Sequence, residues 1–364
     1  MPRSAPGFWQ HRGAVAWSLF PLSLFFAFLA GLRRRLFALG WLKSERLPVP
    51  VIVVGNIAVG GSGKTPVALW LAAELRACGR RPGIVSRGYG GSIEGVACVP
   101  AGGDPARFGD EPVLMASVSG CPVFVGRDRP AAARALLAAH PDVDVLIADD
   151  GLQHYRLARD VELVVVDEAT LGNRLRLPAG PLREGVGRLA DATLIFAHGE
   201  FSPALLRAVR PVPVFSFKLA GAAFERVANR SEICLAADLC GRRIHAMAGI
   251  GRPERFFAQL ESMGLVIERR PFADHHAFTP ADVAVPDGDA RVGVVRLARP
   301  LSEVNAEVRA LRNRIVLGIV IATVLALALA FWIAERTARP VRVLTRTVQD
   351  LAAGCCGLAG TAGM

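Results

Sequence analysis

A glycine-rich segment between an apolar run and a helical pattern constrains the fold of this chain more than any other feature. It reads Ala58-Val59-Gly60-Gly61-Ser62-Gly63-Lys64-Thr65 and fits the P-loop pattern, with Ala in place of the first Gly. Glycines let consecutive backbone N–H groups converge on phosphate oxygens, and the start of the following helix adds its dipole. In such a loop Lys64 reaches the β- and γ-phosphates, and the Thr65 hydroxyl can ligate Mg²⁺. A chance glycine-rich turn is the other interpretation, which the flanking patterns disfavour.

The residues around this loop alternate between strand and helix patterns. Val51 to Gly55 is a β-branched run ending in Gly, and Pro66 to Ala77 has helical spacing. Further strand candidates are 83–86, 122–125, 143–148, 161–166, 192–197 and 245–248, with helices at 129–139 and 253–263. Such alternation indicates a parallel sheet. The expected fold class is α/β, a P-loop NTPase-like parallel sheet flanked by helices.

Near the N-terminus, the 20 residues from Gly13 to Leu32 carry no charge and are followed by Arg33, Arg34 and Arg35. This run is long enough to cross a bilayer core of about 30 Å. The arginines place the rest of the chain on the cytoplasmic side. A cleaved signal peptide would have the reverse charge order, and a buried core helix is the remaining alternative. We predict an N-terminal membrane helix.

The formal net charge of +11 could serve nucleic acid, an anionic membrane or a phosphorylated substrate. The apolar run favours the membrane, and no nucleic-acid module is visible, so we expect no nucleic-acid partner. The seven cysteines are scattered and form no CxxC pair, which indicates neither a zinc site nor a disulfide framework.

Two carboxylates end one of the predicted strands. Asp149 and Asp150 follow the apolar run 143–148. Ligands of open α/β sheets bind at the carboxyl ends of the strands, so an acid there can hold Mg²⁺ directly or through water. Taken alone, the pair could equally be a solvated turn. Beside a P-loop, the magnesium interpretation is favoured.

The segment from Asp149 to His154 reads Asp-Asp-Gly-Leu-Gln-His. Together with Gly55 to Pro66, it resembles the tetraacyldisaccharide 4'-kinases of lipid A synthesis. Further matching segments, in order along the chain, are 86–90, 109–112, 177–184, 248–251 and 272–276. The similarity extends from the N-terminal helix to about Val283.

The resemblance implies transfer of the γ-phosphoryl group of ATP, with Mg²⁺, to the 4'-hydroxyl of a tetraacyldisaccharide 1-phosphate lipid, forming lipid IVA. It implies a glycolipid substrate, membrane lipids as partners, and the inner (cytoplasmic) membrane as the location, with the kinase domain facing the cytoplasm. The base would be Asp110, with His275 tuning its basicity, and Lys64 and Arg183 would offset charge on the transferred group. Thr65 and Asp149 would hold the metal. The nucleotide site would comprise Ala58, Val59, Gly60, Gly61, Ser62, Gly63, Lys64, Thr65, Tyr89, Asp150, Gln153 and His154.

Plainer interpretations stay open for several of these residues. Asp110 could cap the helix that begins near Glu111, Arg183 could be a surface charge, and Tyr89 a turn aromatic. A different membrane-associated P-loop NTPase, such as a GTPase or a transport ATPase, is the alternative function. The sequence contains neither an Asn-Lys-x-Asp nor a Leu-Ser-Gly-Gly-Gln segment, which disfavours both.

The likeness stops near Val285. A second 20-residue uncharged run, Ile315 to Ala334, predicts a C-terminal transmembrane helix, and the residues after it resemble the HAMP linker of a sensor histidine kinase. A catalytically impaired fusion with a sensor-kinase fragment is therefore another alternative. The expected divisions are an anchor with its basic flank (1–47), a C-terminally truncated kinase domain (48–285), a helical linker (286–314), the transmembrane helix (315–334) and the HAMP-like tail (335–364).

Overall fold

The computed structural model describes residues 6–218, 223–226, 229–251, 253–273, 276, 278–279, 282 and 295–298. The chain divides into one unit of Met1–Ala220 with Phe224–Arg296, and a second of Gly221–Ala223 with Leu297–Met364. The predicted second membrane helix at 315–334 and the HAMP-like tail lie outside the described residues, as does His275.

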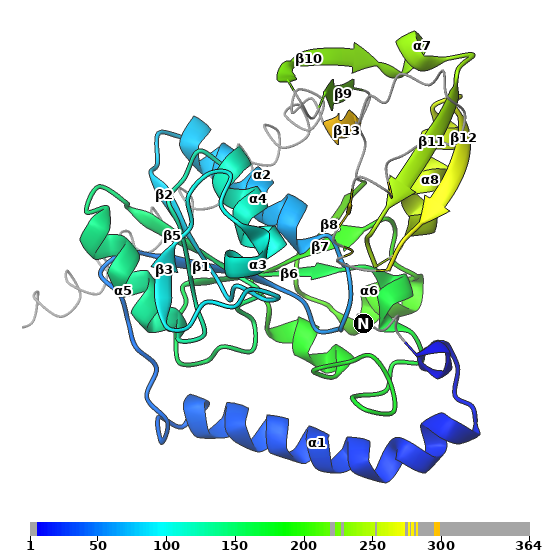
Figure 1. Ribbon diagram of the computed structural model, residues 1–364. Helices are drawn as coiled ribbons and strands as arrows, with labels where there is room; N and C mark the ends of the chain where they lie inside the picture. The colour runs from blue at the N-terminus through cyan, green and yellow to red at the C-terminus, as the bar shows by residue number, and fades with distance from the viewer. Residues whose placement is uncertain are drawn as a thin grey trace, which may run out of the picture. The chain divides into compact units, whose positions relative to one another are not determined.

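Eight strands form one sheet, in the order β3-β4-β2-β5-β1-β6-β7-β8 (Figure 1). Strand β1 lies near the middle and pairs in parallel with β5 and β6. The other pairs are also parallel, except that β3 runs antiparallel to β4 at one edge. The predicted α/β fold is confirmed. The strands are β1 Val51–Gly55, β2 Pro82–Ser86, β3 Val96–Cys98, β4 Val123–Gly126, β5 Val145–Asp149, β6 Val161–Val166, β7 Leu194–His198 and β8 Val214–Phe217.

Helices cover both faces of this sheet, which is why its central strands are apolar on both sides. One core cluster joins Val54 of β1 to α2 and α4, through Val67, Ala72 and Met115. The other cluster joins the opposite side of the sheet to α5, α6 and the turn η3. The helices of this region are α2 Lys64–Ala77, α3 Pro105–Phe108, α4 Asp110–Val118, α5 Arg129–Ala139 and α6 Pro203–Ala208, with the 3₁₀ turns η2 Glu168–Leu171 and η3 Val186–Asp191.

A smaller βαβ element follows the large sheet. Strands β11 (Arg243–Ala248) and β12 (Val266–Pro271) are parallel, and α8 (Pro253–Ser262) connects them. Phe257 and Leu260 bury the inner face of α8. Strand β11 and helix α8 agree with the sequence prediction, whereas β12 was not predicted. The remaining elements are α7 (Ala236–Leu239) and a sheet of β9 (Ala223–Arg226), β10 (Asn229–Leu235) and β13 (Val295–Ala298) in the order β10-β9-β13.

The predicted N-terminal apolar helix is present as α1, Ala14–Ala38, after the turn η1, Gly7–Gln10 (Figure 1). It is long enough and apolar enough to cross a membrane. One face contacts the rest of the chain: Ala16 and Ser23 are buried, and the Ser23 hydroxyl donates to the carbonyl of Arg176 at 2.8 Å. The other faces expose large apolar side chains, namely Val15, Trp17, Leu22, Leu24, Phe25, Phe28, Leu29 and Leu32.

Candidate active site

The glycine-rich segment forms the turn between β1 and α2, as the sequence predicted. Gly60 and Gly63 adopt φ angles of 114° and 88°, a backbone conformation that residues other than glycine rarely adopt. Helix α2 begins at Lys64, immediately after Gly63. The buried Asn56 amide donates to the Ser62 hydroxyl at 3.0 Å and so ties the two ends of the turn together. A loop of this shape presents its backbone N–H groups and the start of α2 to an anion.

A distant segment pairs with this loop and brings Arg183 to it. The backbone N–H of Arg183 donates to the carbonyl of Ile57 at 2.7 Å, and that of Val59 donates to the carbonyl of Pro181 at 2.9 Å. Ala58 and Leu182 form an antiparallel bridge between these bonds. The position of Arg183 is therefore fixed by backbone pairing with the P-loop, which disfavours an incidental surface charge.

Asp150 receives two cations at this point. Arg183 donates through Nη1 to both carboxylate oxygens, and Lys64 Nζ lies 3.7 Å from Asp150 Oδ1. Burial raises the pKa of Asp150, but Lys64 and Arg183 together outweigh it and lower that pKa below its ordinary value. Asp150 also has a φ of 45°, an uncommon conformation for a residue with a side chain. The carboxylate is thus ionised and held between two positive groups.

Gln153 and His154 lie on the same loop as Asp150. The Gln153 amide donates to the carbonyl of Asn56 at 3.0 Å and to Glu184 Oε1 at 2.8 Å. Its oxygen accepts from Arg183 at 3.4 Å. Burial and the nearby Arg129 lower the pKa of His154 to about 4, so this ring is neutral at pH 7. Gln153 thereby connects the P-loop, Arg183 and Glu184.

Asp149 is the last residue of β5 and is 1% exposed. Its Oδ2 accepts from the Ser86 hydroxyl at 3.1 Å, while its Oδ1 is buried without a hydrogen-bond partner among the described residues. Burial, with a contribution from Glu111, raises the pKa of Asp149 to about 7. A buried carboxylate oxygen without a donor is a candidate ligand for a cation.

The first turn of α4 carries two further acids of the site, Asp110 and Glu111. The Thr65 hydroxyl donates to Glu111 Oε1 at 3.0 Å. Asp110 is the first residue of α4 and is exposed, while Gly109 takes the N-cap position. The carbonyl of Tyr89 lies only 2.4 Å from where a Cβ on Gly109 would be, so this close approach requires glycine. The Tyr89 side chain itself is 68% exposed.

The predicted pairing of Asp110 with His275 stays a prediction, because His275 lies outside the described residues. The neighbouring His276 is 3.2 Å from Asp282. The described residues contain no group of three or more His, Cys, Asp or Glu side chains that could hold a metal. Magnesium does not require one, because it usually keeps several waters and takes only one or two carboxylates.

Three further residues belong to this site although the sequence did not single them out. Glu111 contacts Thr65, and Glu184 accepts hydrogen bonds from Gln153 and from the Tyr155 hydroxyl. Both acids directly follow residues that were predicted, so their neighbours were the available signal. Arg129 is 2% exposed and donates to the carbonyls of Gly126 and Asp149. No sequence pattern marks a buried arginine of this kind.

Comparison with known proteins identifies the family. The family model described as tetraacyldisaccharide-1-P 4'-kinase matches residues 15–295. The chain is 59% identical over 293 residues to the tetraacyldisaccharide 4'-kinase of Aromatoleum aromaticum, covering 80% of this chain and 87% of that protein. It is 58% identical over 292 residues to the enzyme of that name from an Azoarcus species, covering 79% and 84%. A crystal structure of LpxK from Aquifex aeolicus in complex with ATP is similar at 30% identity, with a TM-score of 0.63 over 73% of this chain and 85% of that one. The chain belongs to the tetraacyldisaccharide 4'-kinase family.

Proposed function

We propose that this protein transfers the γ-phosphoryl group of ATP to the 4'-hydroxyl of a tetraacyldisaccharide 1-phosphate lipid, forming lipid IVA in lipid A biosynthesis. The observation that carries the proposal is the meeting of the P-loop, Asp149 to Gln153 and Arg183 at one edge of the sheet, in a chain 59% identical to an enzyme of that name.

The nucleotide phosphates are bound by the loop from Ala58 to Thr65. Backbone N–H groups and the start of α2 face the anion, and Lys64 and Arg183 supply positive charge. Phosphoryl transfer is catalysed mainly by positioning and by offsetting charge on the transferred group. A triphosphate would compete with Asp150 for these two cations, so Asp150 holds them in place until the nucleotide binds.

The residues present fit a magnesium ion. Asp149 Oδ1 is a buried carboxylate oxygen without a donor, and the Thr65 hydroxyl lies beside the Glu111 carboxylate. Thr65 and Asp149 would hold the ion, with Glu111 orienting Thr65. When bound, magnesium neutralises charge on the phosphate oxygens. Without magnesium, the pKa of Asp149 is raised because a buried carboxylate with no cation beside it is unfavourable.

Asp110 is the base that accepts the proton of the 4'-hydroxyl. It is exposed at the start of α4, beside Glu111, where an acceptor can approach from solvent. A base placed there would receive the proton as the hydroxyl oxygen attacks the phosphorus. His275 would orient Asp110 and tune its basicity.

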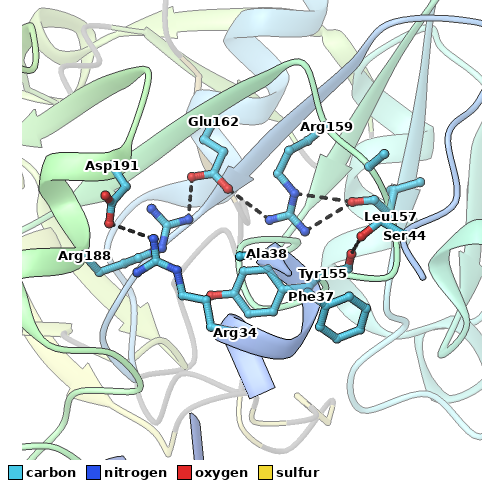
Figure 2. A pocket seen from close by; sticks show the side chains of 11 residues that line it. Arg34, Phe37, Ala38, Ser44, Tyr155, Leu157, Arg159, Glu162, Arg188 and Asp191 are labelled. Carbon is cyan, nitrogen blue, oxygen red and sulfur yellow. Dashed lines mark hydrogen bonds and ion pairs between the residues drawn. The ribbon is translucent and has the colours of Figure 1, made fainter. Parts of the chain in front are cut away.

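The phosphorylated headgroup of the glycolipid lies between α1 and the loop that carries Arg183. A cavity of about 230 Å³ there is lined by Arg34, Arg176, Arg183, Arg188 and Glu184, with small residues of α1. An adjoining cavity of about 380 Å³ shares Arg34 and Arg188 with it (Figure 2). In the larger cavity Arg34 pairs with Asp191, and both Arg159 and Arg188 pair with Glu162. Four arginines line the smaller cavity, and Arg34, Arg183 and Arg188 already pair with acids. An anionic sugar phosphate would compete with those acids for the three guanidinium groups and would meet Arg176 as well.

Helix α1 anchors the enzyme in the inner membrane, with the kinase domain in the cytoplasm. Its exposed apolar side chains suit acyl chains, and Arg33 and Arg35 suit anionic headgroups on the cytoplasmic side. Membrane lipids are therefore partners of α1, and no nucleic acid is required. The acyl chains of the substrate can stay in the bilayer while its headgroup reaches Arg183.

The test is to incubate membranes containing the full chain with labelled ATP and the disaccharide lipid, using Lys64→Ala as the inactive control. We expect a 4'-phosphorylated lipid from the parent and none from the variant. Product from GTP alone would contradict the proposal. ATP binding without any product would instead support a catalytically impaired protein.

A further inference from the structure

Two aromatic rings end adjacent strands of the large sheet. His198 is the last residue of β7, Phe217 is the last residue of β8, and the two are cross-strand partners. Their ring centroids are 5.0 Å apart and the ring planes differ by 15°, so the rings are stacked. Both side chains are only half-buried. Because β1, β6, β7 and β8 run parallel, this pair lies at the same sheet edge as the P-loop.

The ring pair lies against the P-loop itself. A Cβ built on Gly63 would be 3.3 Å from Phe217 Cζ and 3.9 Å from His198 Nδ1. Gly63 immediately precedes Lys64, whose ammonium group faces Asp150. The rings therefore lie beside the residue that precedes the phosphate-binding lysine. None of the site residues predicted from the sequence lies on β7 or β8.

The order of strands indicates which part of a nucleotide reaches these rings. Asp149 ends β5 on one side of β1, and Thr65 contacts Glu111, whose charge also acts on Asp149. The residues proposed to act on the terminal phosphate therefore lie on the β5 side of β1. Strands β6, β7 and β8 extend in the opposite direction. A nucleotide with its terminal phosphate beside Asp149 has its nucleoside end over β6 to β8, where the ring pair lies.

We propose that His198 and Phe217 form the platform on which the adenine ring of ATP stacks. This inference rests on the proposed use of ATP. It adds a binding site for the adenine base to the site for the phosphates. An adenine ring placed on this pair extends an existing stack, an arrangement that aromatic rings favour when offset. Base stacking on protein aromatics contributes substantially and tolerates different bases, because every base has a π-face, so the platform binds the base of the nucleotide without reading its edges.

The platform is held in place before any ligand binds. The Phe217 ring meets the buried Phe196 edge-on at 6.2 Å, and Phe196 in turn packs on Trp70 of α2 at 5.4 Å. On the other side, Arg255 Nη1 lies 3.5 Å from His198 Nδ1, and Asp167 fixes Arg255 through two hydrogen bonds. Rings that are already ordered lose little conformational entropy when a base stacks on them.

The experiment measures two dissociation constants on the full chain in detergent, one for ATP and one for inorganic tripolyphosphate. Phe217→Ala should weaken ATP binding roughly 5- to 100-fold, the range expected for losing one stacked base. It should leave tripolyphosphate binding unchanged, because that ligand has no base. Phe217→Leu keeps most of the apolar volume but removes the ring, so it should give the same selective loss. Phe217→Tyr keeps an aromatic ring and should retain ATP binding.

Phe215→Ala is the matched control. Phe215 lies on the same strand and also packs on Phe196, at 6.4 Å, but it is not among the atoms nearest to Gly63. Phe215→Ala should therefore change the dissociation constant of neither ATP nor tripolyphosphate. The inference is overturned if Phe217→Ala weakens both ligands equally, if it weakens neither, or if Phe215→Ala gives the same selective loss. A parent protein that binds ATP yet forms no 4'-phosphorylated lipid would contradict only the proposed function, and a parent that does not bind ATP would contradict both.

Discussion

Arg183 donates a hydrogen bond to each carboxylate oxygen of Asp150, at 3.0 and 3.1 Å, from a segment that pairs with the P-loop backbone. Arg183→Ala removes one of the two cations near the phosphates while Lys64 stays. Loss of one charged donor at a transition state typically lowers kcat about 100- to 1000-fold. Steady-state kinetics with ATP and the disaccharide lipid would measure this fall.

A control for this variant is Arg174→Ala, on the same stretch of chain. Arg174 is exposed and pairs with Glu168 rather than with a residue of the P-loop, and a surface ion pair of this kind contributes only about 0–1 kcal/mol to stability. Its loss should leave kcat close to that of the parent. If Arg183→Ala turned over like Arg174→Ala, the proposed role of Arg183 would be wrong.

Asp110→Asn removes the proposed base while keeping the size of the side chain. General bases contribute roughly 10²- to 10⁴-fold, so kcat should fall by that order. The dissociation constant for ATP should change little, because Lys64 and the P-loop are untouched. Single-turnover kinetics together with nucleotide titration would separate the two effects.

Asp104→Asn offers a nearby comparison for that experiment. Asp104 is also exposed, and it caps the short helix α3 through the N–H of Ala106, a bond that asparagine can keep. It should retain parental turnover. Retained turnover in Asp110→Asn would remove Asp110 as the base.

Much of the large sheet could be predicted because its strands are continuous apolar runs. The range Val161–Val166 agrees with β6, and Arg129–Ala139 agrees with α5. Strand β8 was not predicted because it has only four residues, Val214–Phe217. A polar Ser216 interrupts its apolar run, and Pro213 directly precedes it. Strand β12, Val266–Pro271, carries Glu and Arg side chains on a small two-stranded sheet, so its apolar signal is weak.

The P-loop could be predicted because its chemistry is local, with eight consecutive residues performing one task. The partners of Asp149 could not, because Ser86 and Glu111 reach it through sheet order and helix packing. The pairing of Arg183 with Asp150 likewise depends on a backbone bridge between Ala58 and Leu182. Contacts of this kind follow from topology, which a single sequence does not display.

Replacing two exposed apolar residues of α1 should release the protein from membranes. Leu24 and Phe28 are 55% and 62% exposed, and neither side chain supports the core. Burying a Leu or Phe side chain contributes about 1.5–3 kcal/mol, and an aspartate contributes none of it. Leu24→Asp with Phe28→Asp should therefore move most of the protein from the membrane pellet to the supernatant in a sedimentation assay.

The corresponding control places the same charges elsewhere. Leu206 on α6 and Val266 on β12 are also exposed apolar residues, so Leu206→Asp with Val266→Asp should remain in the membrane pellet. If the α1 variant also stayed in the pellet, α1 would not be the anchor.

The buried Asp149 carboxyl makes stability depend on pH. Burial raises the pKa of Asp149 from its ordinary value of 3.8 to about 7, so folding favours the protonated form. This contribution to stability is fully present below pH 3.8 and is lost as the pH rises through 7. Without magnesium or nucleotide, Asp149→Asn should therefore melt at least about 2 °C above the parent at pH 8, with a smaller difference at pH 5.

Asp150→Asn should behave in the opposite way. The pKa of Asp150 is lowered because Lys64 and Arg183 outweigh the effect of burial, so its charge stabilises the fold above pH 3.8. Its neutralisation should lower the melting temperature at pH 8. Magnesium with a nucleotide should raise the melting temperature of the parent at pH 8 more than that of Asp149→Asn, since the amide is a poorer ligand. An Asp149→Asn variant that melts below the parent at pH 8 would show that this carboxylate already has a partner in the free enzyme.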